Sequence, residues 1–144
     1  FGNLSGQYLG AAFDAEALLA RTETVSAELR LEEVRWQAAM EWADSVGVDI
    51  INTSLIYNFG HDDPAEDYDT TDMDGNTSLI SQAADEAAQR GILVVCSAGN
   101  DGSIGFWGGK IGTPCDADSV LCVGATDDSG GPVPFSSEGP TTAA

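Results

Sequence analysis

The residue of this chain best placed for chemistry is Asn100, which follows a predicted buried strand. Residues 92–96 form an unbroken apolar run rich in β-branched side chains, which predicts a strand covered on both faces, as in parallel α/β sheets. Three small residues, 97–99, then lead into a turn at Asn100-Asp101-Gly102, where the last glycine can take a positive φ. Because ligands of open α/β sheets bind at the carboxyl ends of the strands, we expect the Asn100 amide to donate a hydrogen bond into a cleft. The alternative is that Asn100 only forms the turn.

Four short motifs follow one another along the chain. They are Asn-Thr-Ser-Leu at 52–55, Ser-Ala-Gly-Asn-Asp-Gly at 97–102, Ser-Val-Leu-Cys-Val-Gly-Ala-Thr-Asp at 119–127 and Phe-Ser-Ser-Glu-Gly-Pro-Thr at 135–141. In order and approximate spacing they resemble the subtilisin-like serine proteases, the subtilases, and the resemblance runs from about residue 6 to residue 141. It implies a three-layer α/β/α fold with a mainly parallel sheet, here incomplete.

The resemblance also implies roles for individual residues. Asn100 matches the oxyanion-hole asparagine of the family, and Gly112 matches the floor of the primary specificity pocket. The resemblance further implies a substrate-binding surface made of two short segments together with Gly112. The first segment is Ser54, Leu55 and Ile56, and the second is Ser97, Ala98 and Gly99. In the family, the segment matching 54–56 pairs with the substrate backbone as an added strand. Ile56 stands where the family has glycine, so we expect it to narrow the pocket or to displace the substrate strand; the alternative is a local shift that turns Ile56 aside.

The catalytic triad of the family comes in the order Asp, His, Ser, and its three motifs do not occur in this sequence. The single histidine, His61, lies after residues 52–55, whereas the matching histidine would precede Phe1. We therefore expect residues 1–144 to be an internal portion of one catalytic domain of a serine endopeptidase, inactive alone. The resemblance implies a polypeptide substrate and a secreted or extracellular full-length protein. The alternative is a non-catalytic α/β binding or interaction module derived from a protease scaffold.

The charge of the chain restricts its partners. With 24 acidic and 5 basic residues, the net charge is −19, which argues against nucleic acid or an anionic membrane as a partner. Such an acidic excess favours a halophilic source, and an acidic secreted protein is the alternative. A nucleotide-binding fold is disfavoured because neither a G-x-G-x-x-G motif nor a P-loop follows any predicted strand.

No metal site is predicted. The acidic loop at 61–77 suggests calcium, which many subtilases bind, but the glycine of Asp72-x-Asp74-Gly75 comes fourth rather than sixth and the twelfth residue is Ala83. A solvated loop is therefore favoured, with His61 exposed in it, and calcium stays possible in the full-length enzyme.

The three cysteines cannot all pair within one chain. Cys96 and Cys122 lie in apolar strand runs, which favours free cysteines that act as small hydrophobic side chains. The spacing of Cys115 from these two matches no zinc pattern.

Periodicity predicts the elements that position the site. Strands are expected at 16–21, 48–55, 92–96 and 120–125, and helices at 31–46 and 77–90. Apolar residues that recur every three or four positions are expected to form the buried face of the first helix: Leu31, Val34, Ala38, Trp42 and Val46. Trp36 and Met40 flank this face and are expected to be partly exposed. In the family another strand lies between those matching 16–21 and 48–55. That gap predicts either poor order before Leu31 or self-association of the isolated chain.

Overall fold

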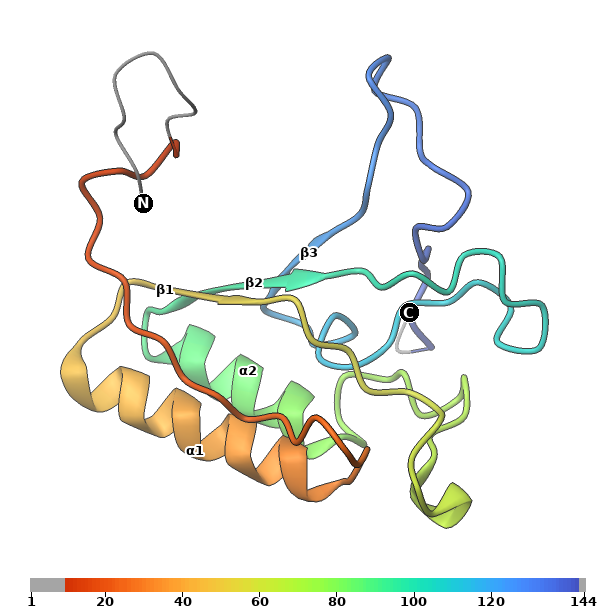
Figure 1. Ribbon diagram of the computed structural model, residues 1–144, viewed down its shortest axis with the longest axis horizontal. Helices are drawn as coiled ribbons and strands as arrows, with labels where there is room; N and C mark the ends of the chain where they lie inside the picture. The colour runs from red at the N-terminus through yellow and green to blue at the C-terminus, as the bar shows by residue number, and fades with distance from the viewer. Residues whose placement is uncertain (1–9, 143–144) are drawn as a thin grey trace.

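The computed structural model of the protein describes residues 10–142, so that residues 6–9 of the subtilase resemblance lie outside the described part. Three parallel strands form one sheet in the order β1-β2-β3, with β1 at Ile50–Thr53, β2 at Leu93–Ser97 and β3 at Leu121–Val123 (Figure 1). Two α-helices, α1 at Leu31–Val46 and α2 at Leu79–Gln89, lie along one face of this sheet, and a short 3-10 helix, η1, spans Pro64–Glu66. The predicted α/β class with a parallel sheet is confirmed.

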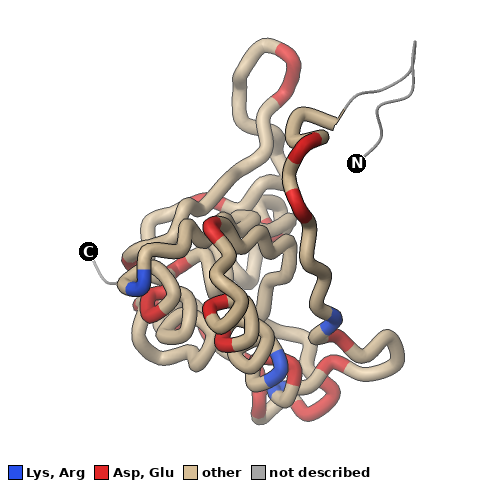
Figure 2. The backbone as a smooth tube through the Cα atoms, turned by 90° about the vertical axis from the view of Figure 1, so that its left-hand side faces the viewer, with Lys and Arg blue, Asp and Glu red and all other residues tan. Residues whose placement is uncertain are grey.

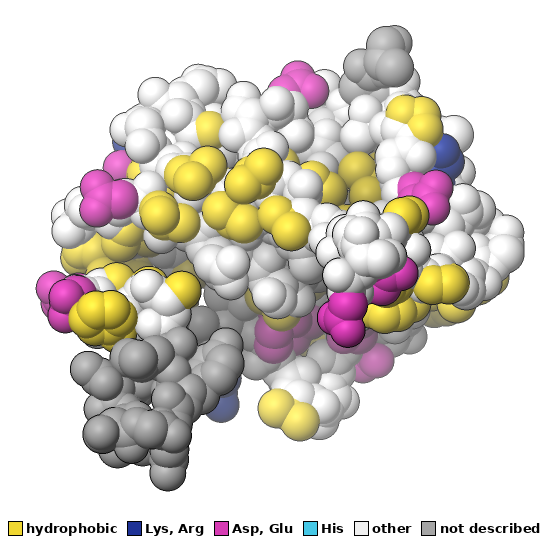
Figure 3. Space-filling view, turned by 90° about the horizontal axis from the view of Figure 1, so that it is seen from above, with side chains coloured by type: hydrophobic (Ala, Val, Ile, Leu, Met, Phe, Trp, Pro, Cys, Tyr) yellow, Lys and Arg dark blue, Asp and Glu magenta, His cyan; other side chains and the backbone are white. Residues whose placement is uncertain are grey.

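The described residues supply the sheet and one helical layer, which agrees with an incomplete three-layer fold. The face of the sheet opposite the helices carries an apolar patch of large exposed side chains (Figure 3): Ile50, Leu93, Leu121 and Val123. We call these four residues the uncovered sheet face. Within residues 10–142 no helix is long and apolar enough to cross a membrane.

The strand β2 is central, as the apolar run predicted, but within residues 10–142 it is covered on one face only, because the second helical layer is not part of these residues and Leu93 is exposed. It pairs with β1 through Ile50 opposite Leu93, and with β3 through Cys96 opposite Cys122. The side chain of Val94 is fully buried. Because β2 has a parallel neighbour on each side, its carboxyl end, where Asn100 follows, is held firmly in the middle of the sheet.

The helix α1 packs with a different face from the predicted one. Trp36 and Met40 are buried, whereas all five expected core residues are exposed: Leu31, Val34, Ala38, Trp42 and Val46. The Trp36 indole reaches the sheet and donates a hydrogen bond to Thr53 Oγ1 over 3.2 Å. The predicted end of the helix is confirmed, because Gly47 closes it in the left-handed conformation with φ 77°.

Two buried glutamates explain why the hydrophobic pattern of α1 misled. Glu32 accepts a hydrogen bond from the Leu29 amide at 3.1 Å, and Glu33 accepts one from the Tyr68 hydroxyl at 2.8 Å. Buried carboxylates are tolerated when they are hydrogen-bonded in this way. The inward face of the helix therefore contains two charged residues that a hydropathy pattern assigns to solvent.

The helix α2 lies within the predicted range 77–90 and buries a face of mostly small side chains, including Ala83, Ala84 and Ala87. Its N-cap is Ser78, whose hydroxyl accepts a hydrogen bond from the Ser81 amide at 3.1 Å. Because the cap hydroxyl is also fully buried, it has contacts beyond the helix, which are described with the site.

The predicted strand at 16–21 is wrong. These residues follow an irregular course, and Leu19 is 92% exposed. An extended segment becomes a strand only when a neighbour completes its hydrogen bonds, and β1 forms the edge of the described sheet on this side. The segment therefore has the composition of a strand without the partner that would make it one.

Candidate functional site

The turn after β2 is held from two sides. Ser137 donates its amide to the Gly99 carbonyl at 3.1 Å and accepts the Asp101 amide at its hydroxyl over 3.0 Å. From the loop after β1, the Asn58 amide group donates to Asp101 Oδ2 at 2.7 Å. Asn100 lies between these anchored residues and is exposed. This arrangement fixes the backbone of the turn while it leaves the Asn100 side chain open to a ligand.

The glycines of the turn serve different purposes from those predicted. Gly99, not Gly102, takes the positive φ, at 103°. Gly102 is required because another chain segment passes very close: its Cβ would lie 2.7 Å from the Pro134 carbonyl oxygen, and its amide donates to the Phe135 carbonyl at 3.0 Å. The turn is thus fastened to the loop that carries the fourth motif.

The structure brings together the three segments expected to bind substrate. Ile56 contacts both Gly99 and Gly112: a Cβ atom on Gly112 would lie 2.7 Å from Ile56 Cγ1, and one on Gly99 would overlap the Ile56 δ-methyl group. The next residue, Tyr57, is bridged to Thr113 by hydrogen bonds of 2.9 and 3.1 Å between their backbones. Segments that are far apart in sequence therefore meet at one side of the Asn100 turn.

A buried hydroxyl network that we did not predict anchors the loop after Gly112. The Thr113 hydroxyl is hydrogen-bonded to Ser78 Oγ and lies 2.5 Å from Ser81 Oγ, and Ser81 donates to Asp116 Oδ1 at 2.6 Å. Asp116 also accepts the Gly75 amide at 2.9 Å. This network ties the loop to the first turn of α2. The sequence indicates this network only through Ser81, a polar residue on the apolar face of that helix.

The cysteine prediction was wrong for Cys122, which forms a disulfide with Cys115. These two residues are seven positions apart, and their pairing fastens the loop after Gly112 to β3. Cys96 is the free, buried cysteine, as expected. Burial, reinforced by the negative charge of Asp116, raises the pKa of its thiol to about 12, so that the thiol is neutral and unreactive.

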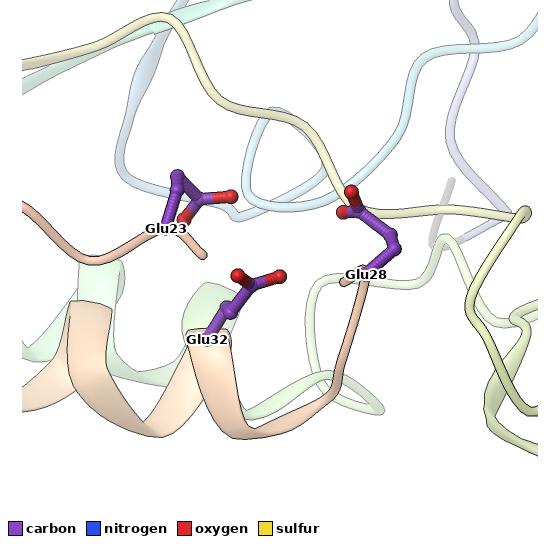
Figure 4. Close-up of side chains that lie close together, drawn as sticks. All are labelled: Glu23, Glu28 and Glu32. Carbon is purple, nitrogen blue, oxygen red and sulfur yellow. The ribbon is translucent and has the colours of Figure 1, made fainter. Parts of the chain in front are cut away.

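An acidic cluster, which the sequence analysis also missed, lies beside the Tyr57 segment (Figure 4). Carboxylate oxygens of Glu23, Glu28 and Glu32 lie within 4.8 Å of one another and come from the irregular segment before α1 and from its first turn. Tyr57 donates its hydroxyl to Glu23 Oε1 at 2.5 Å. Burial and the charges of the other two glutamates raise the pKa of Glu28. Three such carboxylates are the kind of ligands that hard cations prefer.

The predicted acidic loop uses its carboxylates differently. Asp74 Oδ1 accepts the backbone amides of Asn76 and Thr77 at 2.8 and 2.7 Å, and these bonds lower the pKa of its carboxyl. Asp69 similarly accepts the Thr71 amide at 2.6 Å. These residues cap turns, and the carboxylates gathered closely enough to bind a cation within residues 10–142 are those of the acidic cluster.

His61 is buried rather than exposed in this loop. Its Nδ1 lies 3.0 Å from Asp67 Oδ1, and its ring packs edge-on against Tyr68. The carboxyl of Asp67 has a lowered pKa, mainly because it accepts the His61 backbone amide at 2.9 Å. Because His61 is engaged with its own loop, the structure gives it no place beside Asn100.

Asp and Glu residues are spread along the backbone and outnumber Lys and Arg by 24 to 5 (Figure 2). Two of the ion pairs in the described part gather on Arg90, whose guanidinium lies 2.9 Å from Asp44 and 2.6 Å from Glu86. Most of the acidic residues therefore have no cation to balance them.

Known proteins match this chain along most of its length. The model of the Subtilase family matches residues 1–144. Subtilisin DY of Bacillus licheniformis is 40% identical over 102 residues, which are 71% of this chain and 31% of that protein. Subtilisin Savinase of Lederbergia lenta is 31% identical over 100 residues, or 69% of this chain and 29% of that protein. The chain thus spans about three tenths of the length of these relatives.

Solved structures agree with the sequence matches. The prenylagaramide maturation protease PagA superimposes with a TM-score of 0.52 at 26% identity, over 75% of this chain and 33% of that one. A mutant of the protease domain of PatA gives a TM-score of 0.51 at 28% identity, over 72% of this chain and 32% of that one.

Proposed function

The chain belongs to the subtilase family, and from that membership we propose that it supplies the oxyanion donor and part of the substrate-binding cleft of a serine endopeptidase. The observation that carries the proposal is the meeting of the Asn100 turn with Ile56 and Gly112 at the end of the central strand. The family acts on polypeptides, so the substrate is a peptide chain.

The proposed chemistry of Asn100 follows from acyl transfer. Negative charge develops on the carbonyl oxygen of the scissile bond as the tetrahedral intermediate forms, and a fixed donor stabilises that charge with little reorganisation. An asparagine amide is a suitable donor because it is neutral and does not titrate. The hydrogen bonds of Ser137 and Asn58 around Asp101 support this role, since they hold the turn still while the Asn100 side chain stays open.

The proposed substrate path runs along the edge formed by residues 54–56 and 97–99. A peptide in extended conformation would pair with the backbone of residues 54–56 as an additional strand, while residues 97–99, whose Ala98 amide already donates to Val123, would border its side chain above Gly112. Ser54 is exposed, which supports an accessible edge. The net charge of −19 argues against nucleic acid as an alternative partner.

Residues 1–144 contain none of the triad motifs, so the proposal assigns the nucleophile and the base to other segments of the full-length protein. We also propose that the protein is secreted, because the Cys115–Cys122 disulfide is typical of an oxidising compartment.

The test of the proposal is Asn100→Ala in the full-length protein. We expect kcat to fall with little change in KM, because the donor acts in the transition state. The expected fall of about 10²–10³ is the value known for an oxyanion-hole asparagine of a subtilisin, carried over by family and not worked out from this structure. Asn76→Ala, in an exposed turn, is the matched control. A loss carried entirely by KM would contradict the oxyanion role.

The second candidate function is a non-catalytic peptide-binding module on the same scaffold, and the position of Ile56 in the cleft favours it. Labelling of the full-length protein with a fluorophosphonate probe distinguishes the two. An endopeptidase reacts through its activated serine, whereas a binding module does not react and still binds extended peptides.

A further inference from the structure

The side chain of Ile56 occupies the space between two glycines of the cleft. Its δ-methyl group lies where a side chain on Gly99 would be, and its Cγ1 and Cδ1 lie 2.7 and 2.9 Å from the Cβ position of Gly112. If these glycines border the pocket for the residue that precedes the scissile bond, as the proposed function has it, that pocket is already filled from within. We propose that Ile56 restricts this pocket to substrates with glycine or alanine at that position.

Ile56 is not free to swing out of the pocket. It is half-buried, and the residues after it are anchored by two backbone hydrogen bonds between Tyr57 and Thr113 and by the 2.7 Å bond from Asn58 to Asp101. A β-branched side chain also has few χ1 rotamers. Movement of the backbone at Ile56 would therefore have to break this bridge, and the side chain itself has few rotamers in which it could turn aside.

The opposite wall cannot retreat either. Gly112 is buried, and the loop that follows it is held by the hydroxyl network through Thr113 and by the Cys115–Cys122 disulfide. On the other side, Gly99 is constrained by the Ser137 amide, which donates to its carbonyl. A large substrate side chain would thus overpack the site, because the segments around Ile56, Gly99 and Gly112 are each held by hydrogen bonds or by the disulfide.

The size of the effect follows from the cost of overpacking. One additional methylene in a well-fitted pocket changes kcat/KM by roughly 10–200-fold. A benzyl side chain exceeds a methyl group by far more than one methylene. We therefore expect kcat/KM for phenylalanine before the scissile bond to be about tenfold or more below that for alanine, even if the site relaxes. Glycine and alanine have the smallest side chains and therefore need the least space beside Ile56.

The closing experiment compares the native full-length protein with Ile56→Gly on peptides that differ only in the residue before the scissile bond. We expect kcat/KM of the native protein to be about tenfold or more higher for the alanine peptide than for the phenylalanine peptide. In Ile56→Gly, kcat/KM for the phenylalanine peptide should rise by about tenfold or more, whereas kcat/KM for the alanine peptide should change by less than about threefold. Ile56→Ala, which keeps a β carbon, gives an intermediate result if the glycine variant does not fold. Ile50→Ala, on the uncovered sheet face, is the matched control and leaves the ratio unchanged.

A binding measurement separates this inference from the proposed function. N-acetylphenylalaninamide is titrated while the backbone amide signals of Gly99 and Gly112 are followed by NMR, which needs no catalysis. Shifts in Ile56→Gly but not in the native protein support a pocket closed by Ile56, even if no peptide is cleaved and the endopeptidase proposal fails. Native protein that cleaves after phenylalanine as readily as after alanine, or that binds the phenyl compound at these glycines, overturns the inference.

Discussion

Reduction of the Cys115–Cys122 disulfide tests how the loop beneath the proposed pocket is held. The bond closes a loop with a sequence separation of seven residues, and a loop of this length corresponds to about 2.4 kcal/mol of lost unfolded-state entropy. For a chain of roughly 150 residues this lowers the melting temperature by about 5–10 °C. We therefore expect the protein to melt several degrees lower in a phosphine reductant than in its absence.

The matched control is the variant Cys115→Ala with Cys122→Ala, which has no disulfide to reduce. Its melting temperature is expected to be the same with and without reductant, because the remaining thiol of Cys96 is already free and buried. The comparison within each protein removes the separate effect of replacing sulfur by a methyl group. The difference between the two reductant responses then reports the disulfide alone.

Two results would refute this reasoning. Titration of the denatured, unreduced protein with a thiol reagent should find one reactive thiol per chain, that of Cys96, and three would show that the disulfide does not form. One thiol together with a melting temperature indifferent to reductant would show that the hydroxyl network holds the loop without help from the disulfide.

Three further predictions concern charge and assembly. The melting temperature should rise as KCl increases to the molar range, because at a net charge of −19 screening shortens the reach of repulsion from about 10 Å at 0.1 M to about 3 Å at 1 M; a flat or falling value would contradict this. Burial and neighbouring glutamates raise the folded-state pKa of Glu28 above its ordinary 4.5, so its contribution to stability is present below that pH and is lost as the pH rises through the folded value. Glu28→Gln should therefore raise the melting temperature at pH 7 more than at pH 4, with the exposed Glu16→Gln as control, and an equal change at both pH values would argue against the shift. The isolated chain should self-associate through the uncovered sheet face and the open edge of β1, and Leu93→Lys should weaken this; light scattering that finds a strict monomer at all concentrations would be evidence against it.

Local sequence patterns predicted the central strand. The run at 92–96 became β2 because its apolar, β-branched residues suit a strand with a parallel neighbour on each side, although Leu93 stays exposed on the uncovered sheet face. The face of α1 was mispredicted because two of its inward residues, Glu32 and Glu33, are carboxylates satisfied by partners outside the helix. Hydropathy cannot recognise a buried charge whose partner, such as Tyr68, is distant in sequence. The same limitation hid the hydroxyl network around Thr113.

The Ile56 position shows where prediction from sequence stops at the site itself. The motif at 52–55 located the residue and identified it as a departure from glycine, and this left three outcomes open: a narrowed pocket, a displaced substrate strand or an Ile56 side chain turned aside by a local shift. The outcome depends on whether the Ile56 side chain contacts Gly99 and Gly112. These glycines are 43 and 56 residues further along the chain, so a local sequence pattern cannot predict the contact. In the structure both glycines touch it, and each contact requires the absence of a Cβ. The glycines thus make room for the isoleucine, so that the filled pocket follows from three residues acting together and not from Ile56 alone.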